Sequence, residues 1–370
     1  MTEPIRILHI VQRMEAGGSQ ALLMNIYRNI DRTKIQFDFL VEYEEKQFYD
    51  DEIKSLGGKI YRTSVREDFN ILKFQKYLHD FFVSHPEYKV IHVHAYTIGV
   101  FCLKAAKDAG IPVRIAHSHN NGIVHDKAYP MKFLLKKLYP LYATDLFACS
   151  EEAGKYFFGK RKYSVLKNGI DSQKFKANHD IRARVRRDLN LRDEELVVGN
   201  IGRLHPQKNQ CYLLHIFKFL HQLHTNSTLL IVGTGELESA LKKECTSLGI
   251  NDSVRFLGNR KDIPRLEQAF DVLAMPSQFE GLGIVAIESQ AAGIPTLCST
   301  GFAPDVEITP LVQRKDLGDS PESWARAILE LSRSTLQHTD TSQAIVDSGY
   351  DIGSIAPKMQ EYYINKFLNK

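Results

Sequence analysis

Two glutamates on either side of a glycine-containing turn offer the clearest chemistry in this sequence. The stretch runs from Phe279 to Glu288, with Glu280 before the turn and an apolar helix start between the turn and Glu288. Backbone amides at such a helix N-terminus are unpaired and favour an anion. The two carboxylates could accept hydrogen bonds from hydroxyls. The pattern suits a ligand with both phosphates and hydroxyls, such as a sugar nucleotide, although two ordinary surface glutamates would give the same pattern.

Two cations form a second candidate site. Residues 196–202 read as a buried strand, and Arg203 and Lys208 follow it, five positions apart. A guanidinium fork and an ammonium point charge at the end of a parallel strand can clamp a diphosphate. The alternative is a pair of surface salt bridges, but Gly202 and Pro206 favour a specific turn here.

The first crossover of the chain has a nucleotide-binding layout without a dinucleotide fingerprint. The apolar run 5–11 predicts a buried strand, Gly17 and Gly18 a turn, and residues 22–30 a helix. The glycines do not make G-x-G-x-x-G, and no Walker lysine follows. Gly17 and Gly18 therefore serve either as turn residues or as a backbone that approaches a phosphate or sugar closely.

Histidines stand at the ends of two predicted strands, 90–94 and 113–120. In a doubly wound sheet, ligands bind beyond the carboxyl ends of the strands. We expect His94 to be a hydrogen-bonded loop residue and His119, between Ser118 and Asn120, to have a functional role. His117, His119 and His125 lack a fourth ligand, so we expect no zinc site.

Length and composition favour a two-domain cytosolic protein. The chain has 370 residues, of which 43% are hydrophobic and 25% charged. That length exceeds what one core normally serves. We find no apolar run of the roughly 18 residues that a membrane span needs, and no signal-peptide layout. The cysteines are odd in number and widely spaced, which favours reduced thiols in the cytoplasm. They are Cys102, Cys149, Cys211, Cys245 and Cys298.

Basic residues concentrate in the first half of the chain. Residues 1–170 carry 25 Lys or Arg against 19 Asp or Glu, which indicates an anionic surface or substrate but is too weak for nucleic acid. Residues 127–167 contain nine basic side chains interleaved with apolar ones. Such a stretch can lie on the anionic inner face of the cell membrane, or it is a solvated face over a core helix. The basic residues are Lys127, Lys132, Lys136, Lys137, Lys155, Lys160, Arg161, Lys162 and Lys167.

Strand and helix patterns alternate through both halves of the chain, which predicts an α/β fold with two Rossmann-like, doubly wound parallel sheets. We expect domains at 1–170 and 171–345 and a final helix within 346–370. The arginine-rich residues 180–193 predict an exposed helix, and Trp324 a core position.

Six motifs are spread along nearly the whole chain. They are Gly17-Gly18, His119, Asn168-Gly169-Ile170-Asp171, Gly202-Arg203-Leu204 with Lys208, Val232-Gly233-Thr234-Gly235, and Glu280-x7-Glu288 with Ala292-Gly293-Ile294-Pro295. In this order they resemble the motifs of the retaining GT-B glycosyltransferases of family 4, particularly the exopolysaccharide and capsule branch.

The resemblance implies a role for each matched residue. Arg203 and Lys208 would hold the donor diphosphate, Glu280 the donor sugar and Glu288 the ribose. The amides of Gly281, Leu282, Gly283 and Ile284 would meet the sugar or phosphate. Gly17, Gly18 and His119 would approach the donor from an acceptor-binding N-terminal domain across a central cleft, and the final helix would pack back on that domain.

The implied activity is transfer of a hexose from a UDP-sugar to a saccharide or polyprenyl-linked saccharide in surface polysaccharide synthesis. Neither metal nor cofactor would be needed. A sugar-nucleotide epimerase or hydrolase and a non-catalytic subunit of a synthesis complex are the alternatives. An oxidoreductase would need the missing dinucleotide fingerprint. The segment from Ser299 to Asp305 lacks the family's glycine-rich turn, which leaves the nucleobase and sugar contacts open.

Overall fold

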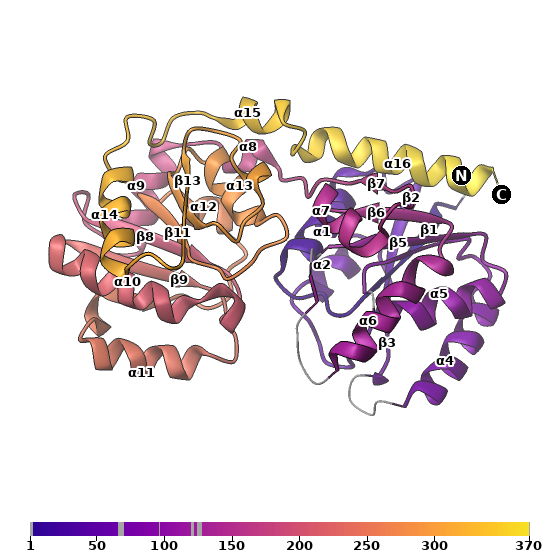
Figure 1. Cartoon of the computed structure of the whole chain (residues 1–370). Coiled ribbons are helices and arrows are strands. Elements are labelled where there is room, and N and C mark those ends of the chain that lie inside the picture. The colour runs from indigo at the N-terminus through magenta and orange to yellow at the C-terminus, as the bar shows by residue number, and fades with distance from the viewer. Residues whose placement is uncertain (1–2, 66–69, 96, 120–121, 124–127, 370) are drawn as a thin grey trace. The chain divides into compact units, whose positions relative to one another are not determined.

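The chain folds into two compact units. Our computed structural model describes residues 3–65, 70–95, 97–119, 122–123 and 128–369, so Asn120, His125 and Lys127 lie outside the described residues. Unit 1 comprises Met1–Gly169 and Ile352–Lys370, and unit 2 comprises Ile170–Asp351 (Figure 1). Residues 346–351, expected with the final helix, stay with unit 2, where α15 (Ser342–Asp347) packs against two other helices.

Unit 1 is built on a seven-stranded parallel sheet in the order β3-β2-β1-β4-β5-β6-β7. The strand order reverses beside β1, as in a doubly wound Rossmann-like sheet. Ile7 and Val11 enter one core, and Leu8 and Ile10 enter the core on the opposite face, as expected of a strand covered on both sides. The strands are β1 (Ile5–Val11), β2 (Ile35–Val41), β3 (Ile60–Arg62), β4 (Val90–Val93), β5 (Val113–Ser118), β6 (Asp145–Ala148) and β7 (Ser164–Val165).

Helices cover both faces of this sheet. α4, α5 and α7 supply one core, while α1 and α16 supply the other. The final helix, α16, yellow in Figure 1, lies beside α1 and contacts β1 and β4, with Met359 and Tyr363 buried. The helices are α1 (Gly18–Asn29), α2 (Asp50–Ser55), α4 (Ile71–Ser84), α5 (Gly99–Asp108), α6 (Tyr129–Leu138), η1 (Tyr139–Leu141), α7 (Glu151–Phe158) and α16 (Ile352–Leu368).

Unit 2 repeats the design with a six-stranded parallel sheet in the order β10-β9-β8-β11-β12-β13. β8 occupies the position that β1 has in unit 1, so its carboxyl end lies where the strand order reverses. The strands are β8 (Leu196–Ile201), β9 (Ser227–Val232), β10 (Val254–Phe256), β11 (Val272–Met275), β12 (Thr296–Ser299) and β13 (Val312–Lys315). Both sheets confirm the predicted fold class.

The helices of unit 2 also divide between two faces. α10, α11 and α14 cover one, with Trp324 fully buried as predicted, and α9, α12 and α13 cover the other. The helices are α8 (Ser172–Phe175), α9 (His179–Asp188), η2 (Pro206–Lys208), α10 (Gln210–Leu223), α11 (Glu238–Leu248), η3 (Asn251–Ser253), α12 (Ile263–Glu267), α13 (Ile284–Ala291), η4 (Pro304–Val306), α14 (Pro321–Leu331) and α15.

The expectation of an exposed arginine-rich helix was wrong for one side of α9. Arg186 is buried, and Arg182 donates to Asp271 at 2.6 Å. Arg186 also donates to the carbonyls of Ala269 and Glu195 at 3.0 and 2.6 Å. A guanidinium has five donors, so it can satisfy several loop carbonyls at once, and charge alone did not reveal this inward side.

Candidate functional site

The loop that leaves β8 is shaped to return Lys208 toward the sheet. Pro206 opens the short turn η2, and the His205 ring accepts a hydrogen bond from the Gln207 amide at 3.2 Å. The Lys208 stem then lies over Gly202, where a Cβ would stand 3.3 Å from Lys208 Cε. A glycine at the strand exit therefore leaves room for the lysine to cross it.

The loop that leaves β11 carries Glu280 to the start of α13. Gly283 caps that helix in the left-handed conformation, with φ of 70°. A Cβ on Gly283 would stand 2.2 Å from Phe302 Cε1, so only glycine fits. The predicted turn and helix start are thus present. The amides of the first turn of α13 stand at the positive end of an eight-residue helix.

Lys208 and Glu280 meet, although they are 72 positions apart. Lys208 Nζ lies 2.5 Å from Glu280 Oε1, with Glu280 only 6% exposed. Two further hydrogen bonds join the two loops. The Gln278 backbone amide donates to the Gln207 carbonyl at 2.7 Å, and the Gln207 side chain donates through Nε2 to the Phe279 carbonyl at 2.9 Å. The cation of one strand end and the acid of another form one site.

Arg203 has a different partner. Its guanidinium is 65% exposed and lies 3.7 Å from Glu236. Gly233 and Gly235, from the loop after β9, approach this segment so closely that a Cβ on either would stand 2.2 or 2.3 Å from the carbonyl oxygens of Gly202 and Leu204. Three strand ends therefore converge here, with Lys208 already paired and Arg203 open to solvent.

Glu288 lies on the buried side of α13, close to a carboxyl group that the sequence did not single out. Burial raises the pKa of Glu288 to about 7. Glu267, fully buried at the end of α12, has its pKa raised well above the ordinary value by burial and then by the charge of Glu288. Neither Glu267 oxygen has a hydrogen-bond partner among the described residues. The sequence feature that could have identified Glu267 was a glutamate on the apolar side of a short amphipathic helix.

The predicted residues of unit 1 lie at the carboxyl edge of its sheet. Gly17 is exposed and caps α1, which begins at Gly18. His119 follows β5 and is half-buried, with Nε2 at 2.8 Å from His94 Nδ1. His94 is hydrogen-bonded, as expected, and also contacts His9. Sequence reasoning missed His9 and His92, although histidines at alternate positions of buried strands share one face of the sheet.

Comparison with known proteins identifies the family. Residues 181–347 match the family model described as Glycosyl transferases group 1. The putative glycosyltransferase EpsF of Bacillus subtilis is 30% identical over 356 residues, which cover 94% of this chain and 93% of that protein. The chain belongs to the group 1 glycosyltransferases. This membership confirms the coarser part of the resemblance, namely the GT-B glycosyltransferase family.

Other relatives of this glycosyltransferase match along nearly its full length. An Escherichia coli UDP-Gal:alpha-D-GlcNAc-diphosphoundecaprenol alpha-1,3-galactosyltransferase is 23% identical, covering 99% of this chain and 98% of that protein. The structure of Anabaena Alr3699/HepE in complex with UDP and glucose superposes with a TM-score of 0.79 at 20% identity, covering 97% and 99% of the two chains. Among the described residues of our glycosyltransferase, no helix is both long and apolar enough for a membrane span.

Proposed function

We propose that this glycosyltransferase transfers a hexose from a UDP-sugar, with retention of the anomeric configuration, to a saccharide or polyprenyl-linked saccharide during surface polysaccharide synthesis. The observation that carries the proposal is the Lys208–Glu280 pair at the N-terminus of α13. Support for the donor comes from the UDP complex of the Anabaena protein. Support for the acceptor comes from the diphosphoundecaprenol named for the E. coli relative.

The donor diphosphate is assigned to Lys208, Arg203 and the amides of Gly281 through Ile284. Charge-assisted hydrogen bonds and a helix N-terminus both favour a diphosphate. When the diphosphate takes Lys208, Glu280 loses a partner and gains the hydroxyls of the donor sugar. Glu288, inward on the same helix, is assigned to the ribose hydroxyls. The nucleotide and the sugar would thus be held from one helix.

Catalysis in this account is positioning and charge stabilisation. The departing diphosphate oxygen removes the proton of the acceptor hydroxyl on the same face of the sugar, so no enzymatic nucleophile forms a bond. Lys208, Arg203 and the helix amides stabilise the negative charge on the leaving group. Because these groups already supply positive charge, we expect the transfer to require no metal.

Unit 1 is assigned to the acceptor. The backbone of Gly17 and Gly18 would approach the donor, since neither residue adds a side chain. His119 would face either the C6 side of the sugar or its reacting carbon. Burial lowers the pKa of His119 to about 4, so at neutral pH it offers a neutral ring for hydrogen bonding.

Helix α6 is assigned to the inner surface of the cell membrane, which would hold the enzyme in the cytoplasm close to a lipid-linked acceptor. The helix has no buried residues. Met131 and Leu134 are 59% and 51% exposed, beside Lys132, Lys136 and Lys137, and Leu141 in the following turn η1 is 53% exposed. Apolar side chains next to lysines suit an anionic lipid surface.

A transfer assay tests the proposal. Purified protein, UDP-sugars and lipid acceptors extracted from cells are combined, and the products are followed by mass spectrometry. We expect one UDP-sugar to add a hexose mass to an acceptor. Consumption of donor without a glycosylated acceptor would favour an epimerase or hydrolase instead. Inertness toward all donors would favour a non-catalytic subunit of a synthesis complex.

A further inference from the structure

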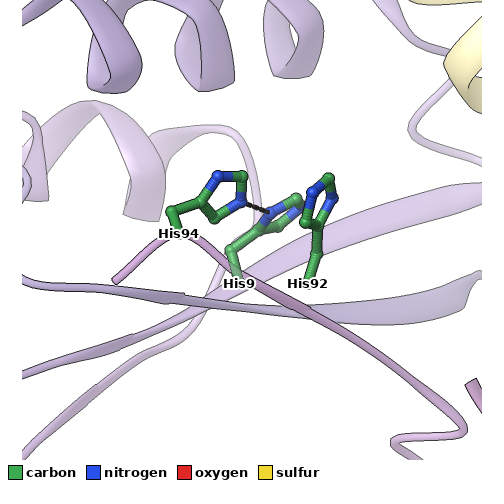
Figure 2. A group of neighbouring side chains, drawn as sticks. All are labelled: His9, His92 and His94. Atoms are coloured by element: carbon green, nitrogen blue, oxygen red, sulfur yellow. Dashed lines mark hydrogen bonds between the residues drawn. The ribbon is translucent and has the colours of Figure 1, made fainter. Parts of the chain in front are cut away.

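Five histidines gather on one face of the sheet of unit 1. His9 on β1 pairs in register with His92 on β4, and His94 lies two residues beyond His92 on the same face. His117 and His119 come from the end of β5. The inner part of this histidine cluster packs under α16, where the Tyr363 hydroxyl lies 2.7 Å from His92 Nδ1. Figure 2 shows His9, His92 and His94 side by side above the strands.

The rings form two hydrogen-bonded series. His9 Nδ1 lies 3.1 Å from His94 Nε2 (Figure 2), and His94 Nδ1 lies 2.8 Å from His119 Nε2. In the second series, His117 Nδ1 lies 3.2 Å from His92 Nε2. These contacts orient His94 and His117 through the ring nitrogen that points into the protein.

Several ring nitrogens of the cluster have no partner. His9 Nε2, His117 Nε2 and His119 Nδ1 are buried without a hydrogen bond among the described residues. Unpartnered nitrogens of neutral imidazole rings are the atoms that bind metal ions.

We propose that His94, His117 and His119 form a binding site for one divalent transition-metal ion, with zinc as the best-suited cation. One ring nitrogen from each lies within 4.8 Å of the others. His94 Nδ1, His119 Nε2 and the unpartnered His117 Nε2 are the ligand atoms. Three imidazoles with an open fourth position match a three-histidine zinc site. The missing fourth protein ligand, on which the sequence expectation of no zinc site rested, therefore does not count against this group.

The surrounding residues fit this assignment. A metal-bound histidine ordinarily donates its other ring N–H to a fixed partner. His94 Nε2 and His117 Nδ1 lie 3.1 and 3.2 Å from ring nitrogens of His9 and His92, which can accept such bonds in the matching tautomer. Zinc bonds of about 2.0–2.1 Å place tetrahedral nitrogens roughly 3.3 Å apart. The 2.8 Å between His94 Nδ1 and His119 Nε2 therefore needs to open slightly. Both rings are half-buried, which gives an ion access.

Unit 2 contains a competing group of metal-binding side chains. Cys211 and His215, one turn apart on α10, lie with Glu244 of α11 at ligand spacing. His215 Nε2 is already 3.2 Å from Glu244, and Cys211 is exposed. This surface group provides the matched control, because it offers three ligand atoms without oriented partners behind them.

Direct metal binding tests the proposal. The full chain is stripped with a chelator and titrated with Co²⁺ and then Zn²⁺, followed by visible absorption of the cobalt form and by metal content. We expect one ion per chain and a cobalt spectrum of nitrogen ligation without a thiolate charge-transfer band. His94→Gln and His119→Asn should abolish this binding, and His9→Gln should weaken it about 10- to 100-fold. Cys211→Ser/His215→Ala should leave it unchanged.

Three results would overturn the site: no bound ion in the wild-type chain, retention in both His94→Gln and His119→Asn, or loss only in Cys211→Ser/His215→Ala. Thermal unfolding without metal checks that each variant is folded. His119→Asn, at a half-buried position, keeps the test decisive if His94→Gln does not fold.

Metal binding at this site should also affect sugar transfer, if His119 contacts the donor sugar as in the proposed function. An ion on His119 Nε2 removes that nitrogen from the donor sugar, so Zn²⁺ should inhibit wild-type transfer at the concentration that fills the site. Binding without inhibition would reject the role of His119 and keep the metal site. Inhibition that persists in His94→Gln would show that Zn²⁺ inhibits transfer by binding at another site.

Discussion

Lys208 and Glu280 form an ion pair across two strand-end loops, with Nζ and Oε1 2.5 Å apart and the glutamate almost fully buried. A buried carboxylate that loses its cation is costly, because its charge is then uncompensated. The pair therefore stabilises the junction of the two loops, and it is the contact that a diphosphate bound as proposed would replace.

Replacing Glu280 with glutamine should separate sugar binding from nucleotide binding. We expect transfer to fall roughly 100-fold, since a misplaced sugar loses alignment. The affinity for UDP, which has no sugar, should be unchanged or higher, because Lys208 is released. Transfer rates and UDP titrations measure the two effects. An undiminished transfer rate would remove Glu280 from the mechanism.

Gly283→Ala should lower the free energy of unfolding of unit 2 by more than the cost of placing an alanine in the left-handed conformation. Gly249→Ala is the matched control, with φ of 69° and nothing within 4 Å of the added Cβ. The backbone cost of about 1–2 kcal/mol is common to both. The overlap with Phe302 should add about 1–3 kcal/mol to Gly283→Ala. Urea denaturation measures both, and equal losses would contradict the role of Phe302.

The pair of buried glutamates predicts a pH dependence. The folded pKa of Glu288 is raised from 4.5 to about 7, so the folded state holds a proton that the unfolded state has released in this window. Stability is therefore greatest near pH 4.5 and falls as pH rises to about 7. Because the charge of Glu288 also raises the pKa of Glu267, this loss of stability belongs to the pair and not to either residue.

Glu267→Gln tests this directly, because it removes the neighbouring carboxyl group without changing its shape. The free energy of unfolding of the variant, measured by urea denaturation without donor, should equal that of the wild type near pH 5 and exceed it at pH 8. Glu330→Gln, at an exposed position of α14, should match the wild type at both pH values. Equal wild-type and Glu267→Gln stability at pH 8 would contradict the coupling.

The membrane contact proposed for α6 would depend on its lysines and its exposed apolar side chains. Neutralising Lys132, Lys136 and Lys137 together should weaken binding to anionic vesicles on the order of 100-fold at low salt. Leu134→Ser should weaken binding as well. Leu72→Ser, 79% exposed on α4, is the control and should have no effect. Vesicle sedimentation measures all three, and unchanged binding of the lysine variant would leave α6 as a solvated face.

The sequence was sufficient to predict the two parallel sheets, because buried parallel strands are short apolar runs, as in residues 5–11 and 196–201. It also identified the turn before α13, since Gly283 stands where a left-handed residue caps the helix. The sequence did not predict contacts between residues that are far apart in the chain. Nothing local joins Lys208 to Glu280, or His92 to Tyr363 271 positions away. The inward arginines of α9 could not be told from the exposed ones in an arginine-rich segment.

The most direct test of the proposed donor site is calorimetric titration of UDP into the wild-type chain, Lys208→Ala and Lys242→Ala. Lys242 is the control because it makes an exposed ion pair with Glu238 at 2.6 Å in the same unit. The account predicts that UDP binds the wild type and Lys242→Ala equally. Lys208→Ala should bind about 10- to 100-fold more weakly, as for a lost charge-assisted bond. Equal affinity in all three proteins would contradict it.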